Sequence, residues 1–396
     1  MRKLVIERLE MVEEDGDFRR YSARLLRMGD EVESSEVLFY DLPGDLPLLE
    51  PDDGDPFLLG ALMLAMREGR AVEVRGSVSR CLVENLEEWM GAWRCWKPEL
   101  YQVVPIEVAS WAAPERYGKR SPGSVAAFSG GVDASHLMWS WRPSGREREA
   151  PLRRAMFVHG FDIPLADSSY EIAYASAVET ARSVGVPLDR VRTNFREVIG
   201  VNWGDACGIA LASCMHFYKS VLTQGLIASS EPYHQLVIPW GSTPVTDYLL
   251  GSDVFRIFHH GAALGRSEKV KLLTEWPIGC ANLRVCWQHA GQGANCGVCE
   301  KCVRTKLNFW AVGVEAPEGM GSELDVAAVK DIHLPSEVYF HEFRQILEYF
   351  RRGNPDDEIA KALESVLNAF RRRQRMDRFL SRLGISRRRR KRKKPR

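Results

Sequence analysis

The sequence has no long apolar run and no leader-like beginning. No stretch approaches the roughly 18 apolar residues that a membrane-spanning helix needs. The N-terminus begins with charged residues, and Glu7 and Glu10 follow too early for a secretory signal. The hydrophobic fraction of 45% and the charged fraction of 27% are ordinary for a globular protein. We therefore expect a cytoplasmic protein that does not contact a membrane.

Several common catalytic signatures are also absent. The sequence contains no His-Glu-x-x-His motif, no persuasive Ser-His-Asp order and no glutaminase motif with a nucleophilic cysteine. It contains no internal repeat. A zinc protease of that type and a serine hydrolase are not predicted, and any ammonia that the protein uses would come from solution or from a partner.

The nine cysteines do not form a disulfide pattern, because their number is odd and their spacing uneven. Three lie within seven residues, at Cys296, Cys299 and Cys302. Without a secretory signal, this clustering favours metal or redox chemistry over disulfides.

The net charge of +1 hides a strong asymmetry. The last 26 residues contain 15 Lys or Arg and one acidic residue, whereas the first 370 contain 39 basic and 52 acidic residues. The body is therefore acidic and the tail is very basic. Such a tail can neutralise nucleic-acid phosphates, although it lacks the aromatic residues that would stack on bases. A solvated tail, or one that pairs with the acidic body, is the alternative.

The pattern of apolar residues divides the chain into four parts. Residues 1–119 mix predicted strands at 19–27, 33–40 and 71–74 with a helix at 56–67, which indicates an α+β accessory domain. Trp89, Trp93 and Trp96 recur at helical spacing and predict buried core, with a stacking platform as the alternative. Residues 316–386 are predicted to be helical, at 335–350 and 356–380, and residues 387–396 to be a disordered basic tail.

Residues 120–315 alternate between strand and helix patterns. We expect strands at 125–128, 155–159, 190–193 and 236–238, and helices at 137–141, 168–184 and 205–222. This alternation predicts an α/β fold with a parallel sheet and flanking helices. Ligands of such sheets bind at the carboxyl ends of the strands. The loops that begin at Ser129, His159, Asn194 and Gly241 should then face one cleft.

A glycine-rich segment at 129–135 joins the first of these strands to its helix. Glycines let the backbone approach phosphate oxygens, and the helix N-terminus offers free N–H groups to an anion. The Ser129 hydroxyl can donate as well, and Asp133 can hold Mg²⁺. The segment therefore predicts a phosphate site, and a turn that serves only the fold is the alternative.

The sequence Ser129-Gly130-Gly131-Val132-Asp133 resembles the pyrophosphate loop of the N-type ATP pyrophosphatases. That family includes NAD synthetase, GMP synthetase, asparagine synthetase and 7-cyano-7-deazaguanine synthase. The resemblance implies an adenine-nucleotide α-hydrolase-like fold and the release of pyrophosphate from ATP to form an adenylated substrate. It also implies that backbone groups at 158–161 hold the adenine. Ala134 departs from the family, which usually has serine there, and Ser135 is the possible substitute.

The three clustered cysteines have the Cys-x₂-Cys-x₂-Cys spacing of a metal knuckle. A fourth thiolate from Cys286, with Cys280 as the competitor, would complete the tetrahedron of structural zinc. Core cysteines and a redox or iron–sulfur role are the alternatives. Together with residues 265–270, the cluster is similar to the end of 7-cyano-7-deazaguanine synthases, in which four such cysteines bind zinc. The likeness spans about residues 123–312 and leaves out the first section and the tail.

These arguments define the candidate site residues. The catalytic candidates are Lys269 and Arg266, because a cation near the α-phosphate would stabilise the charge that develops there, and Asp133, because it can hold Mg²⁺. The residues expected to bind ATP are Ser129, Gly130, Gly131, Val132, Asp133, Ser135, Val158, His159, Gly160, Phe161, Gly241 and Ser242. The expected metal ligands are Cys286, Cys296, Cys299 and Cys302, and the expected cofactors are ATP, Mg²⁺ and Zn²⁺.

Three functions remain open. In the first, ATP activates a small carboxylate or carbonyl oxygen for attack by ammonia or an amine, as in 7-cyano-7-deazaguanine synthase. In the second, the same chemistry modifies tRNA, DNA or a protein, by sulfur transfer or by conjugation of a deazapurine, as in an anti-phage system. In the third, the protein binds ATP without turnover, which only Ala134 supports.

Overall fold

The computed structural model describes residues 2–14, 17–29, 33–118, 120–286, 294–320, 326–335, 337–353 and 357–382. The basic tail at 387–396 lies outside these residues. None of the helices in the described ranges is both long and apolar enough to span a bilayer.

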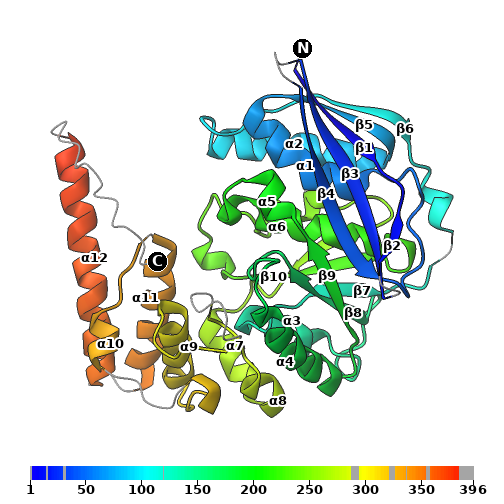
Figure 1. Cartoon of the computed structure of the whole chain (residues 1–396). Coiled ribbons are helices and arrows are strands. Elements are labelled where there is room, and N and C mark those ends of the chain that lie inside the picture. The colour runs from blue at the N-terminus through cyan, green and yellow to red at the C-terminus, as the bar shows by residue number, and fades with distance from the viewer. Residues whose placement is uncertain are drawn as a thin grey trace.

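Among the residues that the structure describes, the N-terminal section contains six strands and two α-helices (Figure 1). The strands are β1 (Lys3–Arg8), β2 (Val12–Glu14), β3 (Phe18–Met28), β4 (Ser34–Pro43), β5 (Ala71–Val78) and β6 (Ile106–Trp111), and the helices are α1 (Asp55–Glu68) and α2 (Arg80–Trp96). The strands and the helix expected here are confirmed. Trp89 and Trp93 are fully buried on α2, and Trp96 is half-buried against them, so the prediction of a tryptophan core is also confirmed.

The central section alternates strands with helices. Its strands are β7 (Ser124–Ala127), β8 (Leu152–His159), β9 (Leu188–Thr193), β10 (Gln224–Ala228) and β11 (Arg256–His260). Its helices are α3 (Val132–Trp141), α4 (Ser169–Ser183), α5 (Phe195–Ile199), α6 (Trp203–Met215), α7 (Arg266–Leu273), α8 (Pro277–Ala281) and α9 (Glu300–Ala311).

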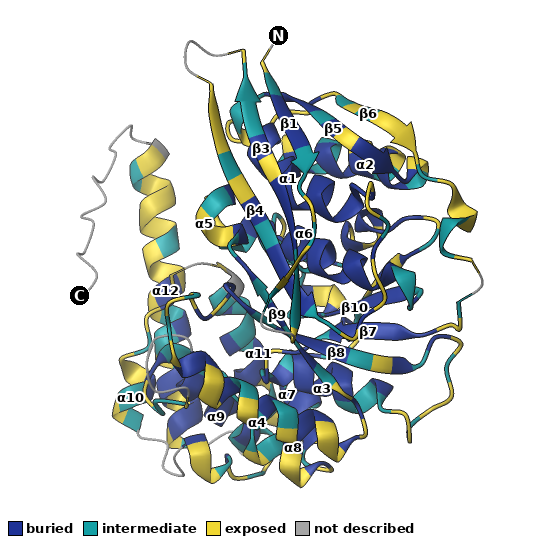
Figure 2. Cartoon of the chain, turned by 45° about the vertical axis from the view of Figure 1, so that its right-hand side comes forward, coloured by how far each residue is buried: buried dark blue, intermediate teal, exposed yellow. Residues whose placement is uncertain are grey.

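The C-terminal section adds α10 (Val326–Lys330), α11 (Glu337–Gly353) and α12 (Glu358–Arg382). These helices pack on one another, and α11 also contacts α9 and α7. The helical character expected for this section is confirmed. Figure 2 shows that the C-terminal half of α12 is mostly exposed, although Arg373 still donates to the Leu334 carbonyl before α11.

One sheet runs through both the N-terminal and the central sections, in the order β11-β10-β7-β8-β9-β4-β3-β1-β5-β6, with β2 on β3. The strands from β11 to β9 are all parallel. An antiparallel pairing of β4 with β9, through Tyr40↔Thr193 and Asp41↔Arg192, joins the two halves. The Asn194 side chain reinforces this junction, since it accepts from the Phe39 N–H and donates to the Val37 carbonyl. The expected boundary at residue 119 stays a prediction, because strands on both sides of it share this sheet.

Helices cover both faces of the parallel strands, as the α/β pattern predicted. Successive side chains of a strand point to opposite faces. Val125 of β7 accordingly joins the core under α1, α5 and α6, whereas Ala126 joins the core under α3, α4, α7 and α8. The same alternation places Met156 of β8 in the first core and Phe157 in the second.

One strand expectation is wrong. Residues 236–238 form no strand; they follow a short 3₁₀ turn, Tyr233–Gln235. The Val237 N–H donates to the Glu231 carboxylate at 2.8 Å, and Pro239 has no N–H, so this segment cannot pair regularly with a neighbouring strand. The strands that occupy this edge of the sheet are β10 and β11. The helix expected at 205–222 is also shorter, because α6 ends at Met215 and a 3₁₀ turn, His216–Ser220, follows it.

Candidate nucleotide and metal sites

The glycine-rich loop lies where β7 ends and α3 begins. Gly130 has φ +76°, a conformation that L side chains rarely adopt, and Gly131 is the N-cap of α3. The first N–H groups of a helix have no partner within the helix, and the helix dipole makes this end positive. The loop therefore presents its backbone donors in the way that an anion site requires.

The strand order places this loop at a topological switch point. When β7 is counted as the first parallel strand, the order read from β9 to β11 is third, second, first, fourth, fifth. This is the order of doubly wound nucleotide-binding sheets, in which the ligand binds where the order reverses, beyond the carboxyl ends of the strands. Here the order reverses at β7, the first strand, which lies between β8 and β10.

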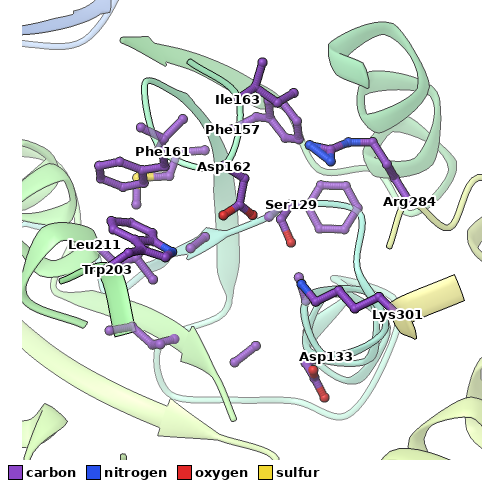
Figure 3. Close-up of a pocket in the computed structure, with 17 residues that line it drawn as sticks. Ser129, Asp133, Phe157, Phe161, Asp162, Ile163, Trp203, Leu211, Arg284 and Lys301 are labelled. Carbon is purple, nitrogen blue, oxygen red and sulfur yellow. The ribbon is translucent and has the colours of Figure 1, made fainter. Parts of the chain in front are cut away.

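A cavity of about 280 Å³ opens at this point. Its floor consists of the ends of β7, β8 and β10, and polar side chains from four segments reach into it (Figure 3). The polar lining residues are Ser129, Asp133, Asp162, Arg284 and Lys301, and the apolar and aromatic lining includes Phe157, Phe161, Ile163, Trp203 and Leu211. An apolar pocket with a few convergent polar groups is typical of small-molecule sites.

The three catalytic candidates lie together. Asp133 Oδ2 is 2.5 Å from Arg266 Nη2, and Asp133 Oδ1 is 3.0 Å from Lys269 Nζ. The two cations are three residues apart on α7, so they share one face of that helix. Lys269 is buried and also donates to the Ser229 carbonyl, just beyond β10. Asp133 lines the cavity, whereas Arg266 and Lys269 are not part of its lining and contact the Asp133 carboxylate.

The charge of Asp133 is fixed by these partners. Burial alone would raise the pKa of its carboxyl, but Arg266 and Lys269 outweigh burial and bring the pKa down to about 2. The carboxylate is therefore ionised at neutral pH. Both of its oxygens contact these cations, and neither oxygen is free for a metal ion in this arrangement. The expected role of Asp133 in holding Mg²⁺ stays a prediction.

Arg284 and Lys301 also line the cavity, and sequence reasoning missed both. Arg284 lies beyond α8, and Lys301 lies in the first turn of α9. Figure 3 shows both side chains reaching toward the cavity near Ser129. Burial lowers the pKa of each, and the nearby Asp162 opposes this effect. The only sequence signal was their position within the cysteine segment, which does not tell where a side chain points.

The residues expected to hold ATP fall into three groups. Ser129, Asp133, Val158 and Phe161 line the cavity. A second group does not line the cavity but lies in the same two segments of the chain: Gly130, Gly131, Val132, Ser135, His159 and Gly160. His159 has a structural environment: its Nε2 is 2.8 Å from the Pro164 carbonyl and its ring stacks on Tyr170.

Gly241 and Ser242 lie elsewhere, because the strand expected before them does not exist. The Gly241 backbone is hydrogen bonded to Gly204 and Gly208 of α6. Ser242 Oγ donates to Asp247, whose carboxylate also contacts His259 Nδ1 at 2.8 Å. Neither residue is part of the cavity wall.

The departure from the expected loop sequence has a visible consequence. Ala134, where the resembled family usually has serine, lines the cavity. Ser135 is fully buried, and its hydroxyl has no hydrogen-bond partner within the described part of the chain. A hydroxyl is therefore missing from the cavity wall, and Ser135 does not replace it there.

The four cysteines expected to bind metal converge on one point. All four Sγ atoms lie within 4.8 Å of one another. Three of the separations are 3.5 Å for Cys299–Cys302, 3.8 Å for Cys286–Cys299 and 3.9 Å for Cys296–Cys302. A tetrahedral ion with Zn–S bonds of about 2.3 Å requires S···S separations of about 3.8 Å. The cluster can therefore hold a zinc ion.

The surroundings of the cluster agree with this reading. The Cys299 N–H donates to Cys296 Sγ at 3.2 Å, and Lys306 Nζ holds the Gly297 carbonyl at 2.8 Å. The contact with the Cys302 thiol lowers the pKa of Cys299 to about 5, which favours a thiolate. Cys280, the competing ligand, instead donates to the Leu273 carbonyl, and burial raises its pKa to about 11. Cys286 thus completes the set.

No family model matches the sequence, and comparisons with curated proteins and with solved structures return no match.

Proposed function

We propose that the protein binds ATP in the cavity and transfers its adenylyl group to an oxygen of a carboxylate or carbonyl substrate. One observation carries this proposal: the glycine-rich loop stands at the switch point of the parallel sheet and opens into a cavity with cationic side chains. A triphosphate needs main-chain donors at a helix N-terminus and nearby positive charge. The likeness of Ser129-Gly130-Gly131-Val132-Asp133 to the loop of the N-type ATP pyrophosphatases narrows the chemistry to release of pyrophosphate.

The reaction follows from this arrangement. A substrate oxygen attacks the α-phosphorus, the bond to the bridging oxygen breaks, and pyrophosphate leaves with the bonding electron pair. Ammonia or an amine then attacks the activated carbon, loses a proton to water and expels AMP. The loop amides and Ser129 bind the phosphates, and the cations at the cavity stabilise the charge on the leaving group. Mg²⁺, when bound with ATP, supplies further charge neutralisation.

The substrate side of the cavity favours a small planar molecule. Phe161, Trp203 and Leu211 provide apolar and aromatic surface, and Asp162 offers a carboxylate to N–H donors. A heteroaromatic carboxylate such as 7-carboxy-7-deazaguanine has both features. The four-cysteine cluster supports this choice, because it matches the zinc ligands of 7-cyano-7-deazaguanine synthases in spacing. A zinc ion held there supplies structure, because four thiolates leave no open position.

The direct test is incubation of the full chain with ATP, Mg²⁺, ammonia and 7-carboxy-7-deazaguanine. We expect AMP and pyrophosphate in equal amounts. Ser129→Ala should slow their formation by about 100-fold, as removal of one preorganised donor does elsewhere. Ser110→Ala, an exposed serine on β6, is the matched control and should react like wild type. ATP binding without AMP formation from any carboxylate would leave a nucleotide sensor, the function that Ala134 favours.

A second candidate function keeps the chemistry and changes the acceptor to a nucleic acid. Exposed arginines along α12, at Arg371, Arg372, Arg375 and Arg378, favour it, together with the basic residues 387–396. Removal of residues 387–396 should then raise KM for a tRNA or DNA acceptor several-fold and leave KM for ATP unchanged. An unchanged KM for the nucleic acid would eliminate this role of the tail.

A sulfur-transfer variant of this second function would use Cys299 and Cys302 as persulfide carriers. Metal analysis separates the two uses of the cluster. About one zinc per chain supports the structural knuckle, and its absence from protein purified without chelators supports persulfide chemistry.

A further inference from the structure

The cysteine segment contacts the phosphate loop directly. The Arg284 N–H donates to the Gly130 carbonyl at 2.9 Å, and Arg284 precedes the metal ligand Cys286 by two residues. A Cβ on Gly130 would lie 3.5 Å from the Arg284 Cβ, so the two segments are in van der Waals contact. A displacement of the segment that carries Cys286 would therefore also displace Arg284, which contacts the phosphate loop.

A second part of the cysteine segment enters the same cavity. Lys301 lies between the ligands Cys299 and Cys302, and its side chain lines the cavity. When the four thiolates converge, Cys299 and Cys302 on either side of Lys301 are held in place. The metal site consequently restrains two cations, Arg284 and Lys301, one on each of its two chain segments.

These two half-buried cations differ from three fully buried cations of the molecule. Lys269 is paired with Asp133, Lys219 with Asp53 and Asp55, and Arg304 with Glu300 and Glu342. By contrast, within the described ranges no ion pair or hydrogen bond engages Lys301 Nζ or the guanidinium of Arg284. The Arg284 Nε is buried without a hydrogen-bond partner, and its guanidinium lies 5.8 Å from the Phe157 ring centroid.

A cation that leaves water without an anion is unfavourable unless a ligand provides that anion. The cavity wall holds two such cations near Ser129 (Figure 3), and the Asp162 carboxylate on the same wall forms no ion pair with either of them in the described part of the chain. Two positive charges beside a helix N-terminus fit a polyanion. A single carboxylate would leave one of the charges without a partner.

We propose that Arg284 and Lys301 bind the phosphate oxygens of the nucleotide, and that the four-cysteine metal site acts as the device that positions them. The inference rests on the ATP binding proposed above. Preorganised side chains lose less conformational entropy when the ligand binds, so metal occupancy should increase the affinity for ATP. The metal would then control nucleotide binding without touching the nucleotide.

The first experiment measures Kd for a non-hydrolysable ATP analogue with Mg²⁺, and Kd for adenosine, by calorimetry on the full chain. Lys301→Met and Arg284→Met should each weaken binding of the analogue by about tenfold, the effect of one lost charge-assisted contact. Binding of adenosine should not change. Lys271→Met, which removes an exposed lysine of α7, is the matched control and should bind like wild type.

The second experiment tests the metal. Cys296→Ser removes the most accessible ligand, and Cys280→Ser removes a cysteine outside the cluster. We expect Cys296→Ser to lose zinc and to bind the ATP analogue as weakly as the Lys301→Met/Arg284→Met double variant. Cys280→Ser should keep the zinc content and the affinity of wild type. Adding Cys296→Ser to the double variant should weaken binding no further, because the metal acts through these two side chains. Chelator-treated wild type provides the same comparison if Cys296→Ser does not fold, as judged by circular dichroism.

The outcomes separate this inference from the proposed function. Wild type that does not bind the ATP analogue overturns the proposed function. Wild type that binds it, with Lys301→Met and Arg284→Met equally tight, overturns only the role of these cations. Two results overturn the positioning role of the metal site. One is a Cys296→Ser variant that loses zinc but keeps its affinity for the ATP analogue. The other is a loss of affinity from Cys296→Ser that adds in full to the loss in the double variant.

Discussion

Two buried charge clusters invite comparison, because they contain the same kinds of residue in different surroundings. One lies at the junction of the N-terminal section and the central sheet, where Lys219 contacts Asp53 and Asp55 at 2.6 and 2.5 Å beside His216. The other lies at the cavity, where Lys269 and Arg266 contact Asp133 beside His136.

The clusters differ in what surrounds them. In the junction cluster every carboxylate is enclosed, and Tyr117 and Ser79 donate to Asp53 and Asp55. In the cavity cluster Asp133 forms part of an open wall that also carries Lys301. Charges that satisfy one another within the fold stabilise it, whereas a charge that faces a cavity without a partner is available to a ligand. Four predictions test this difference.

The largest effect is expected at the junction. Lys219→Met leaves Asp53 and Asp55 buried without their cation, which should lower the free energy of unfolding by about 3–5 kcal/mol. Urea denaturation measures this loss. The variant should still bind the ATP analogue like wild type wherever it is folded. A weaker affinity in the folded variant would show that the junction cluster also supports the nucleotide site.

The histidines of the two clusters should respond to acid alike. Burial and then the neighbouring lysine lower the pKa of His216 and of His136 from 6.5 to about 4. Each residue is neutral when folded and takes up a proton more readily when unfolded, so stability is full above pH 6.5 and falls as the pH decreases toward 4. The full shift corresponds to about 3 kcal/mol for each histidine.

His136→Gln should therefore lose less stability than wild type between pH 6.5 and 4, as measured by urea denaturation at several pH values. His216→Gln is the corresponding variant at the junction. Parallel pH profiles for wild type and both variants would contradict the assignment of neutral histidines to these clusters.

The Asp133 carboxylate gives a smaller effect at lower pH. Its folded-state pKa of about 2 lies below its ordinary value of 3.8, so its stabilisation is present above about pH 4 and is lost as the pH falls toward 2. The shift corresponds to about 2 kcal/mol. The difference in unfolding free energy between wild type and Asp133→Asn should therefore shrink by that amount between pH 5 and pH 2. A difference that is independent of pH would mean that Asp133 is not ion-paired.

The smallest effect is expected from an ion pair in water. Arg190 contacts the Glu171 carboxylate with two hydrogen bonds of 2.9 and 2.7 Å, but the Glu171 side chain is 63% exposed. Glu171→Gln should change the unfolding free energy by less than about 1 kcal/mol. A change as large as that of Lys219→Met would remove the distinction between enclosed and exposed pairs.

The sequence predicted the parts of the fold that depend on local patterns. The α/β alternation, the glycine-rich turn into α3 and the four converging cysteines all follow from short stretches of residues. The same is true of the helices α11 and α12. In each case a few neighbouring side chains determine the local structure.

The predictions failed where contacts between residues far apart in the sequence determine the structure. β10 has the sequence Gln-Gly-Leu-Ile-Ala, which is too short and glycine-containing to stand out, whereas residues 236–238 look like a strand but give an N–H to Glu231. The direction of Arg284 and Lys301 depends on how the cysteine segment docks on the phosphate loop. The continuity of the sheet depends on the pairing of β4 with β9, in which Tyr40 pairs with Thr193 from a distant part of the chain. The spacing of apolar residues along the sequence does not indicate which strands pair or where these side chains point.

That pairing of β4 with β9 has a consequence for any shortened form of the protein. If the chain were cut before residue 120, β9 would become an edge strand whose free N–H and C=O groups invite association with other chains. The buried Tyr40, Phe57 and Phe217, which pack on one another across the cut, would lose their enclosure as well. The central section should therefore aggregate when it is made alone.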